Sequence, residues 1–199
     1  MIERQQVGRP RSEQARAAIL HAVDDLVVES GYGAVTLKGI AERAGVSRQT
    51  IYRWWSTKAE ILLEASAIDA RQELQVPAHE TPAEDVVAYL DALLAFLSTS
   101  DAGTAYRALV GEAQHDAKVA ELLRDTDPVG QSAAEVIERA LPGHEMRLPE
   151  ATAELVGPVF FWVLSGRDPA ELDTGRLAAA FLRNGPGVSR ATAARRRGR

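Results

Sequence analysis

The sequence predicts an all-α fold, and its length permits either one domain of typical size or a small domain fused to a larger one. Long alternating runs of β-branched residues, which indicate strands, are missing. Apolar residues instead recur three and four positions apart, as they do on one face of a helix. Capping residues and Gly or Pro breaks divide the chain into segments of ordinary helix length. With 199 residues, of which 46% are hydrophobic and 26% charged, the chain is long enough to bury a core.

Four helices are expected before residue 76. The first begins at Ser12 as its N-cap and ends at Gly31 and Gly33, because glycine tolerates the left-handed backbone that terminates helices. Its apolar face contains Ala15, Ala18, Ile19, Ala22, Val23, Leu26 and Val27. The second helix runs from the capping residue Thr36 to Gly45, and the third runs from Ser47 to about Trp55. The fourth opens on residues 57–60, Thr-Lys-Ala-Glu, which match a capping box.

The rest of the chain is predicted as helices separated by short breaks. Residues 76–82 contain two prolines and form a loop, after which Thr81 caps a helix with Pro82 at its first position and a span of about 83–97. Further helices are expected at 103–114, 117–125, 128–141, 150–165 and 173–184. We expect the two ends, a basic arm at 1–11 and a basic tail at 185–199, to be flexible and disordered respectively.

Composition excludes several classes of protein. The chain has no cysteine, which rules out disulfides, thiolate metal sites and cysteine nucleophiles. No apolar stretch follows a basic start, and the most apolar run, 156–164, is far shorter than the roughly 20 residues that span a bilayer. The four histidines lack a paired metal spacing, and no nucleophile elbow, phosphate-binding glycine loop or HExxH motif is present. We therefore expect a cytoplasmic protein that has no membrane contact, metal or cofactor and is not an enzyme.

Charge is uneven along the chain. Residues 1–60 hold nine Arg or Lys against seven Asp or Glu, whereas residues 76–189 hold eight against eighteen. Residues 190–199 add five arginines and no acid. A basic N-terminal face can hold DNA even though the whole chain carries a net charge of −5.

The stretch at 36–62, TLKGIAERAGVSRQTIYRWWSTKAEIL, contains two short helices joined by a tight turn. Gly45 supplies the positive φ that such a turn needs, and Ser47 caps the second helix. Arg48 and Gln49 are residue types that make bidentate contacts with guanine and adenine edges. Thr, Tyr and Lys commonly bond phosphates, and Lys58 lies at a helix N-terminus that favours an anion. The predicted DNA-binding residues are Thr36, Lys38, Ser47, Arg48, Gln49, Thr50, Tyr52, Arg53, Trp54 and Lys58.

Residues 12–62 resemble the DNA-binding domain of TetR-family transcription regulators. The resemblance rests on Gly31-Tyr32, Thr36-Leu37, Ile40-Ala41, Ala44-Gly45-Val46-Ser47, Thr50-Ile51-Tyr52, Trp55 and Thr57-Lys58. It implies that the helix from Ser47 to Trp54 enters the major groove, that Tyr52 and Lys58 contact phosphates, and that Trp55 is a buried aromatic. Arg53 and Trp54 depart from the residues common at these places, so the operator sequence does not follow from the resemblance.

The resemblance also implies the domain organisation. A helix-turn-helix at about 36–55 lies within a DNA-binding domain at 12–58, and residues 59–184 form a helical domain for ligand binding and dimerisation. It implies a homodimer that forms through helices 150–165 and 173–184, and a repressor that a small-molecule effector releases from a palindromic operator.

Six aromatic or apolar residues are the candidates to line the ligand pocket: Tyr89, Leu93, Phe96, Tyr106, Phe161 and Trp162. Each is also a candidate for the core or for the dimer interface. Two other functions stay open, a helical protein-interaction module and a small-molecule enzyme with a vestigial DNA-binding head.

Overall fold

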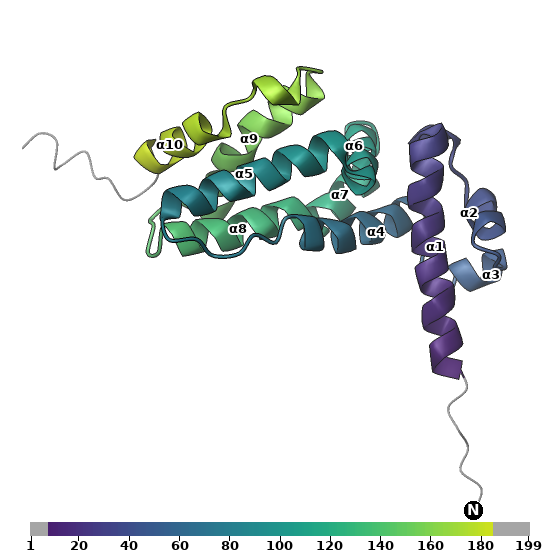
Figure 1. The fold of residues 1–199 in the computed structure, drawn as a ribbon. Coiled ribbons are helices and arrows are strands. Elements are labelled where there is room, and N and C mark those ends of the chain that lie inside the picture. The colour runs from purple at the N-terminus through teal and green to yellow at the C-terminus, as the bar shows by residue number, and fades with distance from the viewer. Residues whose placement is uncertain (1–7, 185–199) are drawn as a thin grey trace, which may run out of the picture. The chain divides into compact units, whose positions relative to one another are not determined.

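The computed structural model describes residues 8–184, and the described part of the chain contains helices and no strand (Figure 1). Residues 1–7 of the predicted arm and the whole predicted tail, 185–199, lie outside the described residues. The elements in chain order are α1 (Gly8–Ser30), η1 (Tyr32–Ala34), α2 (Leu37–Arg43), α3 (Arg48–Ile51), α4 (Lys58–Glu73), α5 (Pro82–Thr99), α6 (Asp101–Glu112), α7 (Ala117–Thr126), α8 (Pro128–Ala140), α9 (Leu148–Leu164), η2 (Pro169–Glu171) and α10 (Thr174–Asn184). The all-α prediction is confirmed.

Helix caps occur where the sequence predicts them, with one exception. The hydroxyl of Thr36 accepts the N–H of Gly39 at the start of α2, and that of Thr81 accepts the N–H of Glu84 at the start of α5. The carboxylate of Glu84 bonds back to the Thr81 N–H at 2.9 Å, which completes a capping box. Ser12 is not a cap, because α1 begins four residues earlier, at Gly8. The start is compatible with Pro10, since a first turn does not need the N–H that proline lacks.

Contacts divide the chain into two compact units. The first unit, called the head here, contains the residues up to Asp69 together with Ser100–Thr126. The second unit, called the body here, contains Ala70–Thr99 and the residues from Asp127 onward. The predicted boundary between residues 58 and 59 therefore does not coincide with this division. The first residues of α4 and the whole of α6 and α7 group with the helix-turn-helix instead.

The head is built on α1, which contacts η1, α2 and α6. The predicted apolar face of α1 supplies its core, and Ile19 and Val23 have no exposed surface. Ile40 of α2 and Ile51 of α3 are also fully buried in this core. Ala105, Leu109 and Val119 belong to the same core cluster, so α6 and α7 help to support α2 and α3.

The body is a layered set of four helices in which α5 contacts α8, α9 and α10 (Figure 1). Its largest fully buried side chains are Tyr89, Phe96, Leu74, Leu90, Leu93 and Leu97. The buried carboxylate of Asp85 accepts a 3.0 Å hydrogen bond from Arg139 Nε, which ties α5 to α8. Burial opposes ionisation of Asp85, but the hydrogen bonds from His79 and Arg139 outweigh it and lower the pKa of this carboxyl.

No single helix within residues 8–184 is both long and apolar enough to cross a bilayer. The consecutive helices α5 and α6 meet the criteria of length and composition only when taken together across the break at Ser100. Seven residues of α5 are buried inside the body, as expected for a helix that belongs to a protein core.

Candidate nucleic-acid interface

The turn between α2 and α3 is a helix end of Schellman geometry. Gly45 adopts the predicted positive φ, +66°. The N–H of Val46 bonds to the carbonyl of Ala41 at 3.0 Å, and the N–H of Gly45 bonds to that of Glu42 at 3.3 Å. These two bonds satisfy carbonyls that the end of α2 would otherwise leave without partners. The turn therefore fixes where α3 begins.

The recognition segment, residues 47–55, is only partly α-helical. The hydroxyl of Ser47 accepts the N–H of Thr50 at 3.1 Å, as predicted for its N-cap. The third helix was expected to reach about Trp55, but α3 ends at Ile51. The N–H groups of Trp54 and Trp55 both bond to the carbonyl of Ile51, at 3.0 and 3.1 Å, so the chain tightens into a turn there.

The side chains predicted to read bases are exposed. Arg48 and Gln49 occupy the first turn of α3, and within the described residues neither side chain has an intramolecular hydrogen bond. Tyr52 is 58% exposed although it is a large aromatic residue. Arg53 is exposed as well, and its guanidinium lies 5.5 Å from the ring centroid of Trp54. These four side chains are free to meet a ligand without breaking a hydrogen bond inside the protein.

Other predicted contacts already have partners in the protein. The hydroxyls of Ser47 and Thr50 are 3.0 Å apart, and that of Thr36 is used as a cap. Lys38 is exposed and pairs with Glu42 at 3.7 Å. Trp54 is half-buried and meets Trp55 edge to face, with 5.6 Å between the ring centroids. The ten predicted residues all lie in the head, within positions 36–58.

Lys58 has a structural role that the sequence did not reveal. Its ammonium donates hydrogen bonds to the carbonyls of Tyr32 and Val35, at 2.7 and 2.9 Å, and lies 4.1 Å from the centroid of the Tyr32 ring. Burial lowers the pKa of this ammonium, although the nearby carboxylate of Glu112 acts in the opposite direction. Lys58 thus joins the start of α4 to the segment that precedes α2, and one ammonium hydrogen remains for another acceptor.

Two side-chain contacts that position the interface were not predicted from the sequence. Trp55 is 4% exposed, which confirms it as a core residue, and its indole N–H donates to Glu64 of α4 at 2.9 Å. At the end of α2, Arg43 bonds to both carboxylate oxygens of Glu29 in α1, at 2.9 and 2.5 Å. Both contacts join residues nine or more positions apart, so no local spacing in the sequence could have indicated them.

The residues predicted for a ligand pocket do not share one environment. Tyr89, Leu93 and Phe96 have no exposed surface and lie in the core of the body. Tyr106 is buried in the head instead. On α9, Phe161 is 63% exposed. The indole N–H of Trp162 donates to the carbonyl of Asp168 at 2.8 Å. The pocket that the structure presents in the head has a different lining, which is described below.

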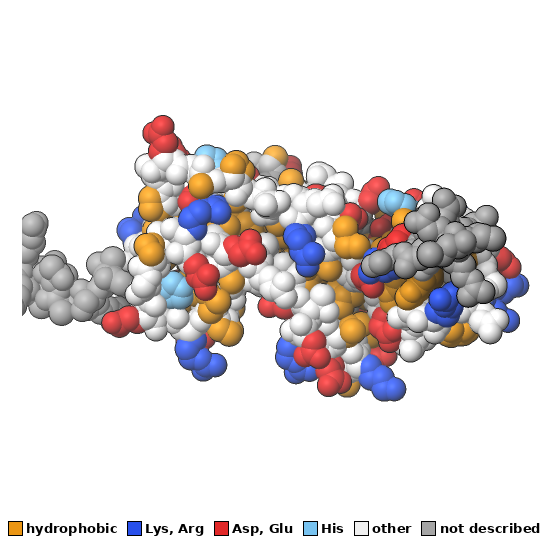
Figure 2. Space-filling view, turned by 90° about the horizontal axis from the view of Figure 1, so that it is seen from below, with side chains coloured by type: hydrophobic (Ala, Val, Ile, Leu, Met, Phe, Trp, Pro, Cys, Tyr) orange, Lys and Arg blue, Asp and Glu red, His pale blue; other side chains and the backbone are white. Residues whose placement is uncertain are grey.

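Charges of both signs are mixed on the face drawn in Figure 2, where Lys and Arg side chains lie among Asp and Glu side chains with apolar areas between them. Among the described residues, no group of three His, Cys, Asp or Glu side chains has the arrangement of a metal site.

Comparison with known protein families agrees with this arrangement in both parts of the chain. A family model described as bacterial regulatory proteins of the tetR family matches residues 19–65, which contain α2, α3 and the turn between them. A model described as the tetracyclin repressor-like C-terminal domain matches residues 76–184, more than half of the chain. The chain belongs to the TetR family. It is therefore a helix-turn-helix transcriptional regulator and not an enzyme.

Individual TetR-family relatives support the assignment over most of the chain. The HTH-type transcriptional regulator YdeS of Bacillus subtilis is 39% identical over 163 residues, which cover 79% of this chain and 82% of that protein. The HTH-type regulator Rv2912c of Mycobacterium tuberculosis is 29% identical over 163 residues, 78% of this chain and 82% of that protein. The crystal structure of the TetR family transcription regulator SCO0332 matches with a TM-score of 0.67 and 26% identity, covering 84% of this chain and 94% of that one.

Proposed function

We propose that this TetR-family regulator binds a specific duplex DNA sequence, with the first turn of α3 in the major groove. The observation that carries the proposal is that Arg48 and Gln49 are exposed and that their side chains have no intramolecular hydrogen bond among the described residues. Arginine can bond guanine O6 and N7, and glutamine can bond adenine N6 and N7, each through two hydrogen bonds. These two side chains would supply most of the base discrimination.

Phosphate contacts would set the register of α3 on the DNA. Tyr52 and Arg53, in the turn that follows α3, are exposed and suited to phosphate oxygens. Lys38 lies at the start of α2, and Lys58 retains one ammonium hydrogen beyond the two bound to carbonyls. The hydroxyls of Thr36, Ser47 and Thr50 and the indole of Trp54 lie within the same short stretch and complete the proposed surface.

The protein would act as a homodimer that forms through α9 and α10. Phe161 and Leu164, three positions apart on α9, are 63% and 53% exposed, which is unusual for large apolar side chains. Gly157 lies one turn earlier on the same face, and a Cβ built there meets no atom within 4 Å. Such a face gains apolar burial when a second copy covers it, and a two-fold dimer would read a palindromic operator with half-sites about one helical turn apart.

Release of the repressor from its operator by a small molecule would follow from the linkage between effector binding and DNA binding. An effector that prefers a dimer geometry unable to bind DNA weakens the affinity for the operator by the ratio of its own two affinities. Couplings of this kind typically correspond to about 1–3 kcal/mol. We propose that the protein represses transcription in the cytoplasm until such an effector binds.

The experiment is a selection of bound duplexes from a random DNA library with the purified full-length protein at one stated moderate salt concentration. Enrichment of one short palindrome supports a dimeric, sequence-specific regulator. Absence of any enriched sequence, from protein shown to be folded and dimeric, contradicts sequence-specific binding. A protein-interaction role for the head would show instead as binding that barely responds to salt, because DNA binding releases counterions and weakens steeply as salt is added.

A further inference from the structure

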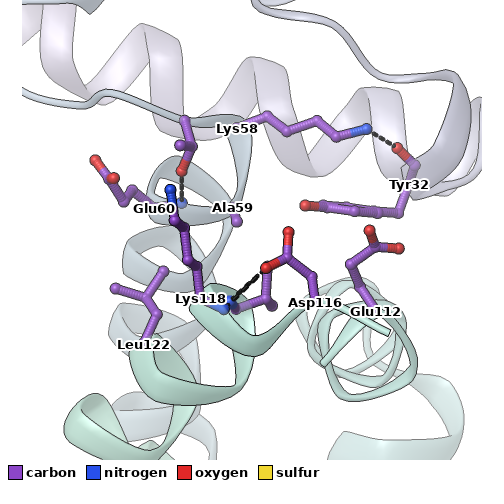
Figure 3. A pocket seen from close by; sticks show the side chains of 10 residues that line it. Tyr32, Lys58, Ala59, Glu60, Glu112, Asp116, Lys118 and Leu122 are labelled. Atoms are coloured by element: carbon purple, nitrogen blue, oxygen red, sulfur yellow. Dashed lines mark hydrogen bonds between the residues drawn. The ribbon is translucent and has the colours of Figure 1, made fainter. Parts of the chain in front are cut away.

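The head contains a pocket of about 320 Å³ that shares only Lys58 with the proposed DNA contacts (Figure 3). Four parts of the chain form its walls: Tyr32 of η1, residues 57–60 at the start of α4, Glu112 at the end of α6, and residues 116–122 at the start of α7. All four belong to the head, so the pocket lies inside one compact unit. Its volume is at the lower end of the range found for sites that bind small molecules.

Acidic groups converge on the Tyr32 side of this pocket. Figure 3 shows the Tyr32 hydroxyl and the Asp116 carboxylate directed towards each other, with Glu112 beside the ring. Within the described residues, the Glu112 carboxylate accepts no hydrogen bond. Asp116 uses Oδ1 to cap α7, where it accepts the N–H of Lys118 at 2.8 Å, and Oδ2 remains available. Burial, and then the charges of Glu112 and Asp116, raise the pKa of Tyr32 to about 12.

Among the described residues, neither lysine on the pocket wall forms an ion pair with Glu112 or Asp116. The Lys58 ammonium is bound to two carbonyls on the far side of the Tyr32 ring from Glu112 (Figure 3). The Lys118 side chain is exposed. Oε2 of the Glu60 carboxylate accepts a 2.7 Å hydrogen bond from the N–H of Ser56. Glu112 and Asp116 are the two carboxylates beside Tyr32, and they supply the acceptors on that side of the pocket.

Ala59, Val119 and Leu122 supply apolar lining, and the first two of these are buried in the core of the head. Thr57, Glu60 and Lys118 line the pocket as well. A bound molecule would thus meet hydrocarbon from three residues and, beside Tyr32, two carboxylates with a phenolic hydroxyl. This arrangement suits an amphiphilic cation, whose ring displaces water from the apolar wall while its ammonium approaches the carboxylates.

We propose that this pocket binds a small organic cation composed of an aromatic ring and a primary ammonium group. Glu112 and one oxygen of Asp116 accept hydrogen bonds from the ammonium. The ring of the ligand packs against Ala59, Val119 and Leu122. The residues proposed to hold the ligand, Glu112, Asp116 and the apolar lining, are not among the proposed DNA contacts, and the test requires no DNA.

The first experiment is a calorimetric titration of the full-length protein at pH 7.5 with three probes that share one indole ring: tryptamine, the neutral alcohol tryptophol, and the anion indole-3-propionate. We expect tryptamine to bind once per chain and at least about tenfold more tightly than tryptophol, because charged hydrogen bonds are stronger than neutral ones. Indole-3-propionate should not bind. Equal affinity for all three probes, or no binding of tryptamine at millimolar concentration, would overturn the proposal.

Two variants test the location of the site. Glu112→Gln and Asp116→Asn each remove one negative charge, and the asparagine oxygen can still cap α7. We expect each variant to weaken tryptamine binding about fivefold to tenfold while its affinity for tryptophol is unchanged. Glu121→Gln is the matched control, since Glu121 is an exposed carboxylate of α7 outside the pocket wall, and it should bind tryptamine like the wild type. Unchanged tryptamine affinity in both pocket variants, with thermal unfolding like that of the wild type, would place the ligand elsewhere and overturn the proposal.

Discussion

The indole N–H of Trp55 donates a 2.9 Å hydrogen bond to the carboxylate of Glu64, and Glu64 also pairs with Arg16 of α1. Trp55 is the last residue of the recognition segment, and Glu64 lies in α4. The bond therefore ties the segment proposed to meet DNA to the two helices that support it. Since α3 has only four residues, its orientation depends on such contacts more than on its own helical hydrogen bonds.

Replacing this indole tests the support directly. Trp55→Phe keeps an aromatic ring in the core but removes the indole donor to Oε2 of Glu64 and leaves Arg16 as the partner of that carboxylate, so we expect the free energy of unfolding to fall by about 1–3 kcal/mol. Urea unfolding and operator affinity should both show the loss. The matched control is Trp162→Phe, which removes a similar indole bond, to the Asp168 carbonyl, in the body. It should leave DNA affinity unchanged, and a Trp55→Phe protein with wild-type operator affinity would contradict the supporting role.

The recognition residues should separate into two kinds. Arg48→Ala or Gln49→Ala should cost about 1–3 kcal/mol of binding energy and relax the base preference at one position of the half-site. Tyr52→Ala should weaken binding to every sequence by a similar factor, because a phosphate contact carries no sequence information. Competition binding against a panel of single-base operator variants measures both effects. Arg71→Ala removes an exposed cation outside the head and should change neither the affinity for DNA nor the base preference. If Arg71→Ala weakens DNA binding as much as Arg48→Ala does, the lower affinity results from the change in net charge alone.

Lys58 is expected to combine two roles. Lys58→Met keeps an unbranched side chain that is one atom shorter but removes the bonds to the Tyr32 and Val35 carbonyls, so the thermal unfolding temperature should fall and binding should weaken at every DNA sequence. We expect the third N–H of the Lys58 ammonium to donate to a phosphate oxygen. In that case the slope of the logarithm of the DNA-binding constant against the logarithm of the salt concentration should fall in magnitude by about 1 in Lys58→Met. Weaker binding with an unchanged salt slope would leave Lys58 as a positioning residue only.

The stability of the head should depend on pH through Asp24. Burial, and then the carboxylates of Asp69, Asp25 and Asp101, raise the pKa of Asp24 from 3.8 to about 7, and its Oδ1 has no hydrogen-bond partner among the described residues. Between about pH 4 and 7 the folded protein keeps this proton while the unfolded chain has lost it, so stability falls as pH rises through this range. Above pH 7 the cost of the buried charge is constant.

Asp24→Asn should remove this dependence. We expect the variant to be more stable than the wild type at pH 8 by roughly 2 kcal/mol, a value discounted from about 1.4 kcal/mol per pKa unit because the side chain is only partly buried. At pH 4 the two proteins should differ little. Asp125→Asn, at an exposed position of α7, is the control and should keep the wild-type slope. Parallel stability curves for Asp24→Asn and the wild type would show that Asp24 does not carry the dependence.

The proposed dimer face can be tested with one charge. Phe161→Glu places a carboxylate where an apolar side chain would be covered by the second copy, so we expect the dissociation constant of the dimer to rise by at least a factor of about 100. Analytical ultracentrifugation over a concentration series measures it. Ala95→Glu introduces the same charge at an exposed position of α5 and should not affect assembly. A Phe161→Glu protein that remains fully dimeric would place the interface on another face.

Features set by neighbouring residues could be predicted from the sequence. The caps at Thr36, Ser47 and Thr81 and the positive φ of Gly45 depend only on side chains within four positions, and the structure confirms them. The helices from α5 to α10 begin and end within two residues of their expected bounds. The start of α1 was placed wrongly because Ser12 is a good capping residue, and local preference alone does not decide between it and a start ahead of Pro10.

Features that depend on distant residues could not be predicted. Lys58 bonds to carbonyls 23 and 26 positions away, and the pocket in the head brings Tyr32 close to residues more than 80 positions later. Neither relation leaves a period or a motif in the sequence. The division of the chain was missed for the same reason, since only packing shows that α6 contacts α1.

The backbone passes between the two units three times, within α4, at Ser100 and after Thr126. The DNA reader is thus not a contiguous N-terminal module, because its interior is completed by Ala105, Leu109 and Val119 from a later insertion. A chimera made by grafting only the segment before Ala70 onto another protein would carry an open apolar side on α1. Recombination at that point, in the laboratory or in a genome, would remove the core residues that α6 and α7 contribute to the head. A chimera that keeps the core of the head intact must therefore include residues 100–126.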